Sequence, residues 1–343
     1  MIVVTGGAGF IGSHVVAALA GNPRLDIVVC DRLESDDRWQ NLAGSDVYDI
    51  ISPDQLIDFV RHRAREISAI VHLGAISATT ESNVDRLIEN NIRLSIDLWD
   101  ICSQEEIRLL YASSAATYGD GSQGFVDDQS PEGLEKLRPL NAYGWSKHVV
   151  DRRFVRESRK GQVTPPQWVG FKFFNVFGPN EYHKGSMQSV VAKAFPDASA
   201  GRRVKLFKSH REGYPDGGQL RDFIYVKDAV AVVGWFLDHP EVSGLFNVGT
   251  GQARSFADLV GALYSAVGLP SVIEYVDMPI EIRDKYQYFT QADLRKLRSA
   301  GCDIPFSSLE EGVADYVRNY LMQENRYAGQ SSYRPAATSM KAA

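Results

Sequence analysis

Residues 5–12 read TGGAGFIG, and this glycine-rich stretch decides the fold. Its glycines Gly6, Gly9 and Gly12 fit the spacing G-x-x-G-x-x-G. The apolar strand pattern IVV comes directly before it, and a helical pattern follows at 13–20. Glycines at this spacing allow a tight turn, a close approach of the backbone to a pyrophosphate, and a helix that begins at the phosphate. The stretch therefore predicts a dinucleotide-binding βαβ unit.

The second predicted strand, DIVVC at 26–30, ends at Asp31. Asp31 lies 19 residues after Gly12, where a carboxylate that binds the adenosine ribose belongs. An acid at this position favours an unphosphorylated ribose and hence NAD. Arg32 and Arg38 are close by, and guanidinium groups can hold a 2′-phosphate. These residues alone leave NAD and NADP both open.

Strand and helix patterns keep alternating after this unit. Strands are expected at 47–50, 69–75 and 108–114, and helices at 53–65 and 90–105. This order predicts an α/β fold, a Rossmann-type doubly wound parallel sheet, in which ligands collect at the carboxyl ends of the strands.

The sequence divides into three predicted regions. We expect an NAD(P)-binding Rossmann domain over 1–170 and a tail at 329–343 that is disordered or bound to a partner. Between them, 171–328 is expected to form mainly a smaller, discontinuous C-terminal substrate-binding lobe, with some segments that return to the Rossmann sheet.

A tyrosine and a lysine four residues apart, Tyr143 and Lys147, should share one face of a helix. An ammonium beside a phenol favours the phenolate, so the pair could move protons near neutral pH. Alone, such a pair is ordinary on an amphipathic helix. Ser114 ends the strand at 108–114, where a serine can cap the next segment or hydrogen-bond a substrate oxygen. Serine, tyrosine, lysine and glycine loop together predict a hydride-transfer site.

The bulk properties exclude several classes of protein. The 343 residues carry 37 Lys+Arg against 43 Asp+Glu, a net charge of −6, which argues against a general nucleic-acid or membrane-surface binder. The three cysteines are far apart in the sequence, without metal or redox spacing, as in a reduced intracellular protein. No export signal or spanning segment is visible, and no metal site is predicted. These features favour the cytoplasm.

The motifs resemble those of the extended short-chain dehydrogenase/reductase superfamily, in the branch that modifies nucleotide sugars. HKGSM at 183–187 and FTQADL at 289–294 narrow the resemblance further, since the dehydrogenase core is shared by many sugar-nucleotide enzymes. With YASSAATYG at 111–119, the pattern is similar to the ADP-L-glycero-D-manno-heptose 6-epimerases, from residue 1 to about residue 325.

The resemblance implies an isomerase that inverts C6 of an ADP-linked manno-heptose by transient oxidation and re-reduction. NADP, or alternatively NAD, would be held tightly, one per subunit of a homo-oligomer. The product would supply heptose to the inner core of lipopolysaccharide.

The resemblance also implies the site residues. Tyr143 and Lys184 would be the two acid/base groups, with Ser114 as a catalytic hydrogen-bond donor to the substrate. From its residue type alone, Lys184 would be a solvated loop lysine or a phosphate contact. The expected cofactor contacts are Gly6, Gly9, Phe10, Ile11, Gly12, Asp31, Arg32, Arg38, Leu73, Gly74, Ala75, Ile76, Ser77, Asn90, Lys147 and Val176. The expected substrate contacts are Ser114, Asn175, Ser186, Lys193, Phe207, Arg221 and Tyr286.

The sequence departs from the family pattern at several positions. Arg38 replaces an expected lysine, Lys193 a common histidine, and FKSH at 207–210 an F-E-G-S-like run, before a long segment at 211–220. These departures leave the nucleotide base and the sugar open. One alternative is another nucleotide-sugar enzyme, such as a UDP-hexose 4-epimerase or a dehydratase, although SAAT at 114–117 lacks the acidic pair of a dehydratase. The other is a non-catalytic dinucleotide-binding regulator, which the intact serine, tyrosine and lysine argue against.

Overall fold

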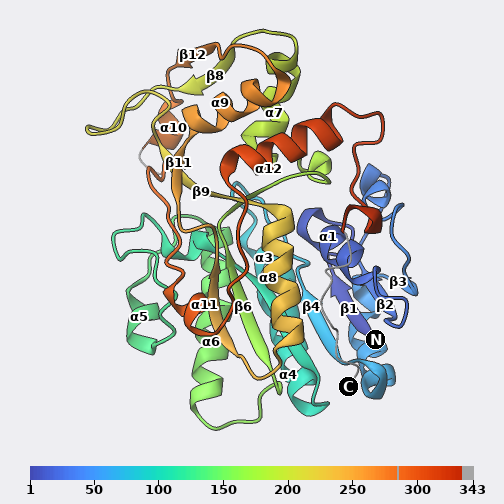
Figure 1. Ribbon diagram of the computed structural model, residues 1–343. Coiled ribbons are helices and arrows are strands. Elements are labelled where there is room, and N and C mark those ends of the chain that lie inside the picture. The colour runs from blue at the N-terminus through green and yellow to red at the C-terminus, as the bar shows by residue number, and fades with distance from the viewer. Residues whose placement is uncertain (284–285, 334–343) are drawn as a thin grey trace.

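A seven-stranded parallel sheet forms the centre of the molecule, in a computed structural model that describes residues 1–283 and 286–333 (Figure 1). The apolar runs that predicted the strands form its buried middle, as expected for a parallel sheet covered on both faces. In spatial order the strands are β10 (Gly244–Val248), β6 (Trp168–Phe173), β5 (Arg108–Ser114), β4 (Ala69–His72), β1 (Ile2–Thr5), β2 (Ile27–Cys30) and β3 (Asp49–Ile51).

Successive strand residues point to opposite faces, so each strand serves two hydrophobic cores. Val4 belongs to the core on the face covered by α1 and α8, whereas Val3 belongs to the core under α2, α4 and α6. This double coverage confirms the predicted doubly wound architecture. The helices that cover the sheet are α1 (Phe10–Leu19), α8 (Val226–Asp238), α2 (Leu56–Arg63), α4 (Leu94–Gln104) and α6 (Ala142–Arg159).

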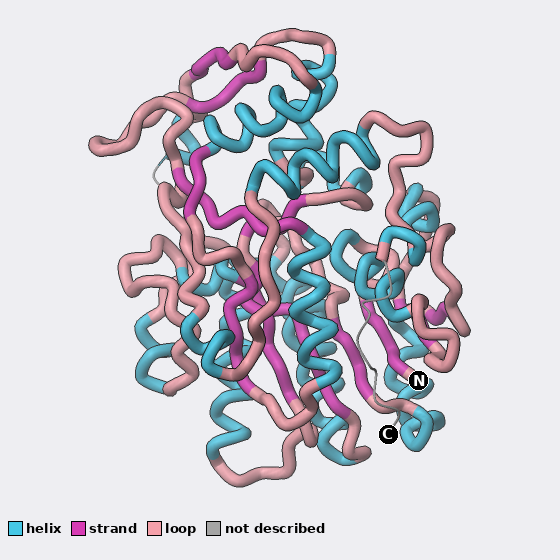
Figure 2. The backbone as a smooth tube through the Cα atoms, in the orientation of Figure 1, coloured by secondary structure: helices cyan, strands magenta, loops and turns pink. Residues whose placement is uncertain are grey.

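A smaller lobe lies beyond the carboxyl ends of the strands, and Figure 2 shows loops connecting it to the sheet. Two short sheets build it, in the orders β11-β9-β7 and β12-β8. Their strands are β7 (Asn175–Phe177), β8 (Val204–Phe207), β9 (Leu220–Tyr225), β11 (Ala253–Ser255) and β12 (Ile273–Val276). The longer helices packed around them are α7 (Val190–Ser199), α9 (Phe256–Val267) and α12 (Leu309–Tyr316). The short helices of the chain are α3 (Val84–Leu87), α5 (Pro131–Lys136), α10 (Ile280–Arg283) and α11 (Arg295–Ser299).

Two element predictions need correction. The helix expected at 90–105 begins with a π-helical turn over Ile88–Arg93, and α4 starts only at Leu94. The strand expected at 47–50 is β3 at Asp49–Ile51. This shift is small because Tyr48 already donates its backbone N–H to Ile27 before the ladder begins.

The predicted tail is ordered at its start. Gln330 donates its backbone N–H to the carbonyl of Gly44, and the hydroxyl of Tyr333 lies 2.6 Å from Nδ1 of His14 on α1. Residues 329–333 therefore pack against the Rossmann sheet's first helix, contrary to the prediction. The rest of that tail, 334–343, lies outside the described residues. Within 1–283 and 286–333, no helix combines the length and apolarity needed to cross a bilayer.

Two buried histidines should make stability depend on pH. Burial lowers the pKa of His14 to about 4 and that of His72 to about 3. Between those values and the unfolded pKa of about 6.5, the unfolded chain binds protons that the folded chain excludes, so stability falls as pH falls.

We expect each of these histidines to cost about 2 kcal/mol of unfolding free energy between about pH 6.5 and about pH 5. Urea unfolding at the two pH values measures the loss, and His14→Gln should reduce it. A loss as large in His14→Gln as in the parent chain would contradict the assignment for His14.

Candidate active site

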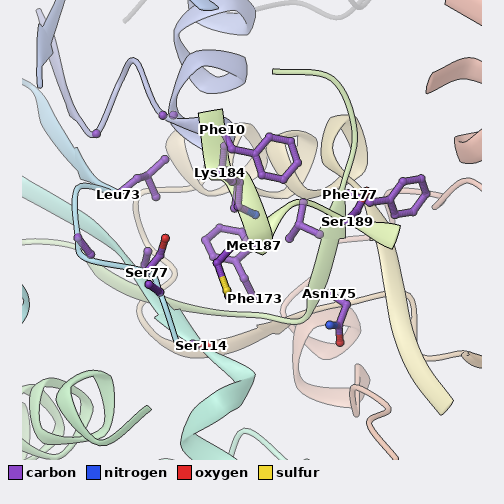
Figure 3. A pocket seen from close by; sticks show the side chains of 18 of the residues that line it. Phe10, Leu73, Ser77, Ser114, Phe173, Asn175, Phe177, Lys184, Met187 and Ser189 are labelled. Carbon is purple, nitrogen blue, oxygen red and sulfur yellow. The ribbon is translucent and has the colours of Figure 1, made fainter. Parts of the chain in front are cut away.

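A cavity of about 650 Å³ lies at the carboxyl ends of the central strands. It is lined by the glycine loop, the ends of β4, β5 and β6, the start of α6, and the segment after β7. Figure 3 shows Lys184 beneath the ring of Phe10, and Ser77 and Ser114 on a different side of the space. The cavity thus joins elements that are far apart in the sequence.

The glycine loop is shaped to admit a phosphate group. Gly6 has φ +65°, and a Cβ on Gly12 would lie 2.0 Å from the carbonyl oxygen of Gly6. The Gly9 N-cap provides no side-chain hydrogen bond, and the first turn of α1 has no acidic residue. The free N–H groups at this helix start are therefore available to an anion, which fits the pyrophosphate of a dinucleotide.

Asp31 lies at the end of β2 and faces the cavity. Its Oδ2 accepts the N–H of Ala8 at 3.0 Å, and its Oδ1 accepts Nη1 of Arg38 at 3.2 Å. Burial raises the pKa of Asp31, and the Arg38 guanidinium opposes that rise. Of the two arginines expected at the cofactor, Arg38 lines the cavity, whereas the exposed side chain of Arg32 pairs with Asp54 at 2.7 Å.

Leu73, Gly74, Ala75, Ile76 and Ser77 line the cavity after β4, as their predicted role requires. The structure does not bring the predicted Asn90 there.

Asn90 is exposed, and its amide donates to the carbonyl of Arg86 at 2.8 Å. Its neighbour Asn91 is buried, hydrogen-bonds both the N–H and the carbonyl of Ile76, and donates to Ser146 on α6. The π-helical turn over Ile88–Arg93 sets which asparagine faces inward, a phase that a regular helix pattern does not predict.

Ser114 and Tyr143 meet in the cavity. The Ser114 hydroxyl accepts the N–H of Ala116 at 3.1 Å, so the serine also caps the segment that follows β5. Tyr143 is half-buried at the start of α6, and burial raises the pKa of its phenol. Hydrogen bonding to Ser114 opposes this rise, whereas the charge of Asp151 adds to it.

Lys147 lies one turn after Tyr143 and is buried. Burial lowers the pKa of Lys147 to about 8, and Asp151 opposes this change. The sequence predicted that this ammonium would favour the phenolate of Tyr143. In the folded protein, burial is the largest influence on the ionisation of both groups, and the effect of the Lys147 ammonium on Tyr143 stays a prediction.

Lys184 approaches the cavity from the other lobe. It belongs to a short helical segment, Tyr182–Met187, and its Nζ lies 4.9 Å from the centre of the Phe10 ring. Burial lowers the pKa of Lys184, the buried carboxylate of Glu181 raises it, and Lys193 lowers it. Lys184 is therefore not the freely solvated loop lysine that its residue type alone suggested.

The remaining predicted substrate contacts lie mostly beside a second cavity of about 460 Å³. Lys193, Phe207 and Tyr286 line it, while Asn175 and Val176 line the first cavity. The two cavities adjoin, since Val190 and Phe256 line both.

Two predicted substrate contacts line neither cavity. The guanidinium of Arg221 is buried beside the second one, 5.2 Å from the Tyr286 ring. Ser186 is exposed, and its carbonyl accepts Nζ of Lys193 at 3.3 Å.

Several lining residues were not predicted, namely His183, Met187, Gln188 and Ser189. His183 directly precedes Lys184, and Met187, Gln188 and Ser189 lie between Lys184 and α7. The sequence carried one signal for them, because Ser189 is the N-cap of α7 and accepts the N–H of Ala192.

A parallel sheet with a glycine loop, an acid after β2 and a Ser–Tyr–Lys group at one cavity is the arrangement of a nicotinamide-dependent hydride-transfer enzyme. The family model described as "NAD dependent epimerase/dehydratase family" matches residues 2–249, and the chain belongs to this family.

Within it, the chain is 49% identical over 323 residues to the ADP-L-glycero-D-manno-heptose-6-epimerase of Nitratidesulfovibrio vulgaris, covering 94% of this chain and 98% of that one. It is 45% identical to the enzyme of the same name from Fusobacterium nucleatum, covering 95% of this chain and 100% of the relative. The crystal structure of the Helicobacter pylori ADP-L-glycero-D-manno-heptose-6-epimerase superposes with a TM-score of 0.74 at 29% identity, covering 93% and 95% of the two chains.

Proposed function

We propose that this protein is an ADP-L-glycero-D-manno-heptose 6-epimerase. It inverts C6 of ADP-D-glycero-D-manno-heptose, and its product supplies heptose to the inner core of lipopolysaccharide. The observation that carries the proposal is a second candidate base, the half-buried Lys184, which lines the cavity from a different element than Tyr143. The identity to the heptose epimerases over nearly the whole of both chains supports the choice of sugar nucleotide.

The two bases match what an inversion needs. The epimers present the C6 hydroxyl on opposite sides, so a proton must be removed on one side and returned on the other. Tyr143, hydrogen-bonded to Ser114, is proposed to serve one epimer, and Lys184 the other. Burial lowers the pKa of Lys184 and so favours the neutral amine that a base requires.

A nicotinamide cofactor, when bound, supplies the acceptor and donor of the C6 hydride. The residues proposed to hold it are the glycine loop, Asp31, Arg38, Lys147 and the strand end at 73–77. Ser114 donates a hydrogen bond to the C6 oxygen as that carbon becomes a carbonyl. Arg221 and Tyr286, beside the second cavity, are proposed to bind the diphosphate part of the substrate.

We propose NADP as the resident cofactor, on the basis of Arg38. Arg38 lies in the cavity beside the ribose-binding Asp31, where its guanidinium can reach a 2′-phosphate. Arg38→Ala should lower the ratio of NADP to NAD in the purified protein by about 10- to 100-fold, the usual worth of a charge-assisted phosphate contact.

Mass spectrometry of the cofactor released by denaturation measures this ratio. Arg32→Ala is the matched control, because that side chain pairs with Asp54 outside the cavity, and it should leave the ratio unchanged. An unchanged ratio in Arg38→Ala would overturn the NADP proposal.

The substrate is tested with the purified protein and no added cofactor. We expect ADP-D-glycero-D-manno-heptose to reach equilibrium with its L-glycero epimer, followed by proton NMR, and UDP-glucose and UDP-galactose to remain unchanged. Conversion of the UDP-hexoses without conversion of the ADP-heptose would replace the proposed function with that of a hexose epimerase.

A further inference from the structure

A fully buried ion pair lies behind Tyr143 and Lys147. The carboxylate of Asp151 on α6 and the ammonium of Lys172 on β6 are 2.7 Å apart, and both side chains have no exposed surface. Asp151 also accepts hydrogen bonds from the hydroxyl of Tyr111 at 3.0 Å and that of Ser113 at 2.7 Å.

This pair connects the elements that carry the proposed proton-transfer groups. Asp151 follows Tyr143 and Lys147 at four-residue steps, so the three share one face of α6. Lys172 donates to the Thr117 hydroxyl at 2.8 Å, and that hydroxyl donates to the carbonyl of Ser114 at 2.8 Å. The ion pair therefore connects α6 to Ser113, which precedes Ser114, and to Thr117, which follows it.

Stability alone is a poor reason for such a pair. Removing two charges from water costs several kcal/mol each, and apolar side chains of similar volume often stabilise a core as well or better. A fixed position and a fixed charge are what a buried ion pair can add.

Burial favours the neutral forms of the tyrosines and histidines around the pair. Burial raises the pKa of Tyr111 and of Tyr118 well above the usual value. Burial also lowers the pKa of His148 to about 4 and that of His72 to about 3. The more distant charges that face this region are Asp127 and Asp293 toward Tyr118, Lys296 toward Lys172, and Arg138 and Arg152 toward His148.

We propose that Asp151 and Lys172 are positioning residues, which hold α6 against Ser114 and set the charge on Lys147 during the reaction. The role in turnover rests on the proposed function. The effect on Lys147 does not, because it is a property of the protein without substrate.

Asp151→Asn tests the proposal directly. Asp151 favours the ammonium form of Lys147, so its loss should lower the titration midpoint of Lys147 by about one pH unit. The ε-carbon signal of isotopically labelled lysine reports this midpoint, and Lys147→Arg identifies the signal. In turnover, the alkaline limb of the kcat profile should move the same way, and kcat should fall about tenfold with KM within about twofold.

Lys227→Met is the matched control. It breaks a lysine–aspartate pair of 2.8 Å, with Asp315, away from both cavities, so it should lower stability without moving the Lys147 midpoint. A folded Asp151→Asn with the parent's midpoint would overturn the proposal. A shifted midpoint in a protein inactive on ADP-heptose would leave the positioning role intact and refute the proposed substrate.

A double variant tests the proposal if Asp151→Asn alone does not fold. Asp151→Asn combined with Lys172→Gln removes both charges and retains groups that can hydrogen-bond Ser113 and Thr117. It should fold and still titrate Lys147 at lower pH, because Asp151 is the charge that acts on Lys147. A folded double variant with the parent's midpoint and kcat would equally overturn the proposal.

Discussion

Tyr143→Phe is expected to lower kcat by about three orders of magnitude, the effect of removing a general acid/base group. The phenol is half-buried at the wall of the cavity and hydrogen-bonds Ser114, so phenylalanine fills the same space and removes only the proton carrier. KM should change little, because the ring still contacts the substrate. Initial rates of heptose epimerisation, measured in quenched reactions over a range of substrate concentrations, give both kcat and KM.

A matched control for this variant is Tyr264→Phe. The Tyr264 hydroxyl hydrogen-bonds the carbonyls of Arg202 and Val272 in the small lobe, and Tyr264 lines neither cavity. Its loss should cost some stability and leave kcat within about twofold of the parent. If Tyr143→Phe retained more than about a tenth of the parent kcat, Tyr143 could not be the acid/base group.

The second large effect is expected for Lys184→Met. Methionine retains the apolar stem beside Phe10 and removes the amine, so one of the two epimers loses its base. Epimerisation should fall by about two orders of magnitude or more. The epimer served by Tyr143 should still be oxidised, so the absorbance of the reduced nicotinamide should rise when that epimer is added.

Lys193→Met distinguishes this effect from a loss of positive charge at the site. Lys193 is exposed and lines the second cavity, so its loss should raise KM. Because Lys193 only adds to the lowering of the Lys184 pKa, kcat should fall far less than in Lys184→Met. Equal loss of both oxidation and epimerisation in Lys184→Met would indicate a binding role for Lys184 instead of a second base.

Much of the fold followed from local patterns. The strand expected at 108–114 is β5 at Arg108–Ser114, and the glycine loop, Asp31 and the tyrosine–lysine pair meet at one cavity. These features depend on short-range geometry: glycine positions, alternation of strand residues and the pitch of one helix.

The rest depended on tertiary structure. Asn91 faces inward in place of the predicted Asn90, because a π-helical turn changes the phase of the helix. Arg32 lies six residues before Arg38 in the sequence, yet its side chain pairs with Asp54 outside the cavity. The ionisation of Tyr143 was predicted from its neighbour Lys147, whereas burial controls it in the folded protein. Whether a particular side chain is buried depends on the whole fold, and the local spacing of residues does not predict it.

The buried partners of the site show the same limit. Asp151 follows the tyrosine–lysine pair on α6, but nothing in its local sequence identifies Lys172 on β6 as its partner. Strand register supplies the missing information, since Ser113 and Lys172 are neighbours across the β5–β6 ladder.

The most direct test of the central claim uses ADP-D-glycero-D-manno-heptose with deuterium in place of hydrogen at C6. If C6 is inverted by removal and return of a hydride, the L-glycero product must keep the deuterium, since hydride on a nicotinamide does not exchange with water. We predict that the two epimers reach equilibrium and that the label is retained at C6, as measured by NMR and mass spectrometry. Loss of the label to solvent during inversion, or no inversion at all, would contradict the account.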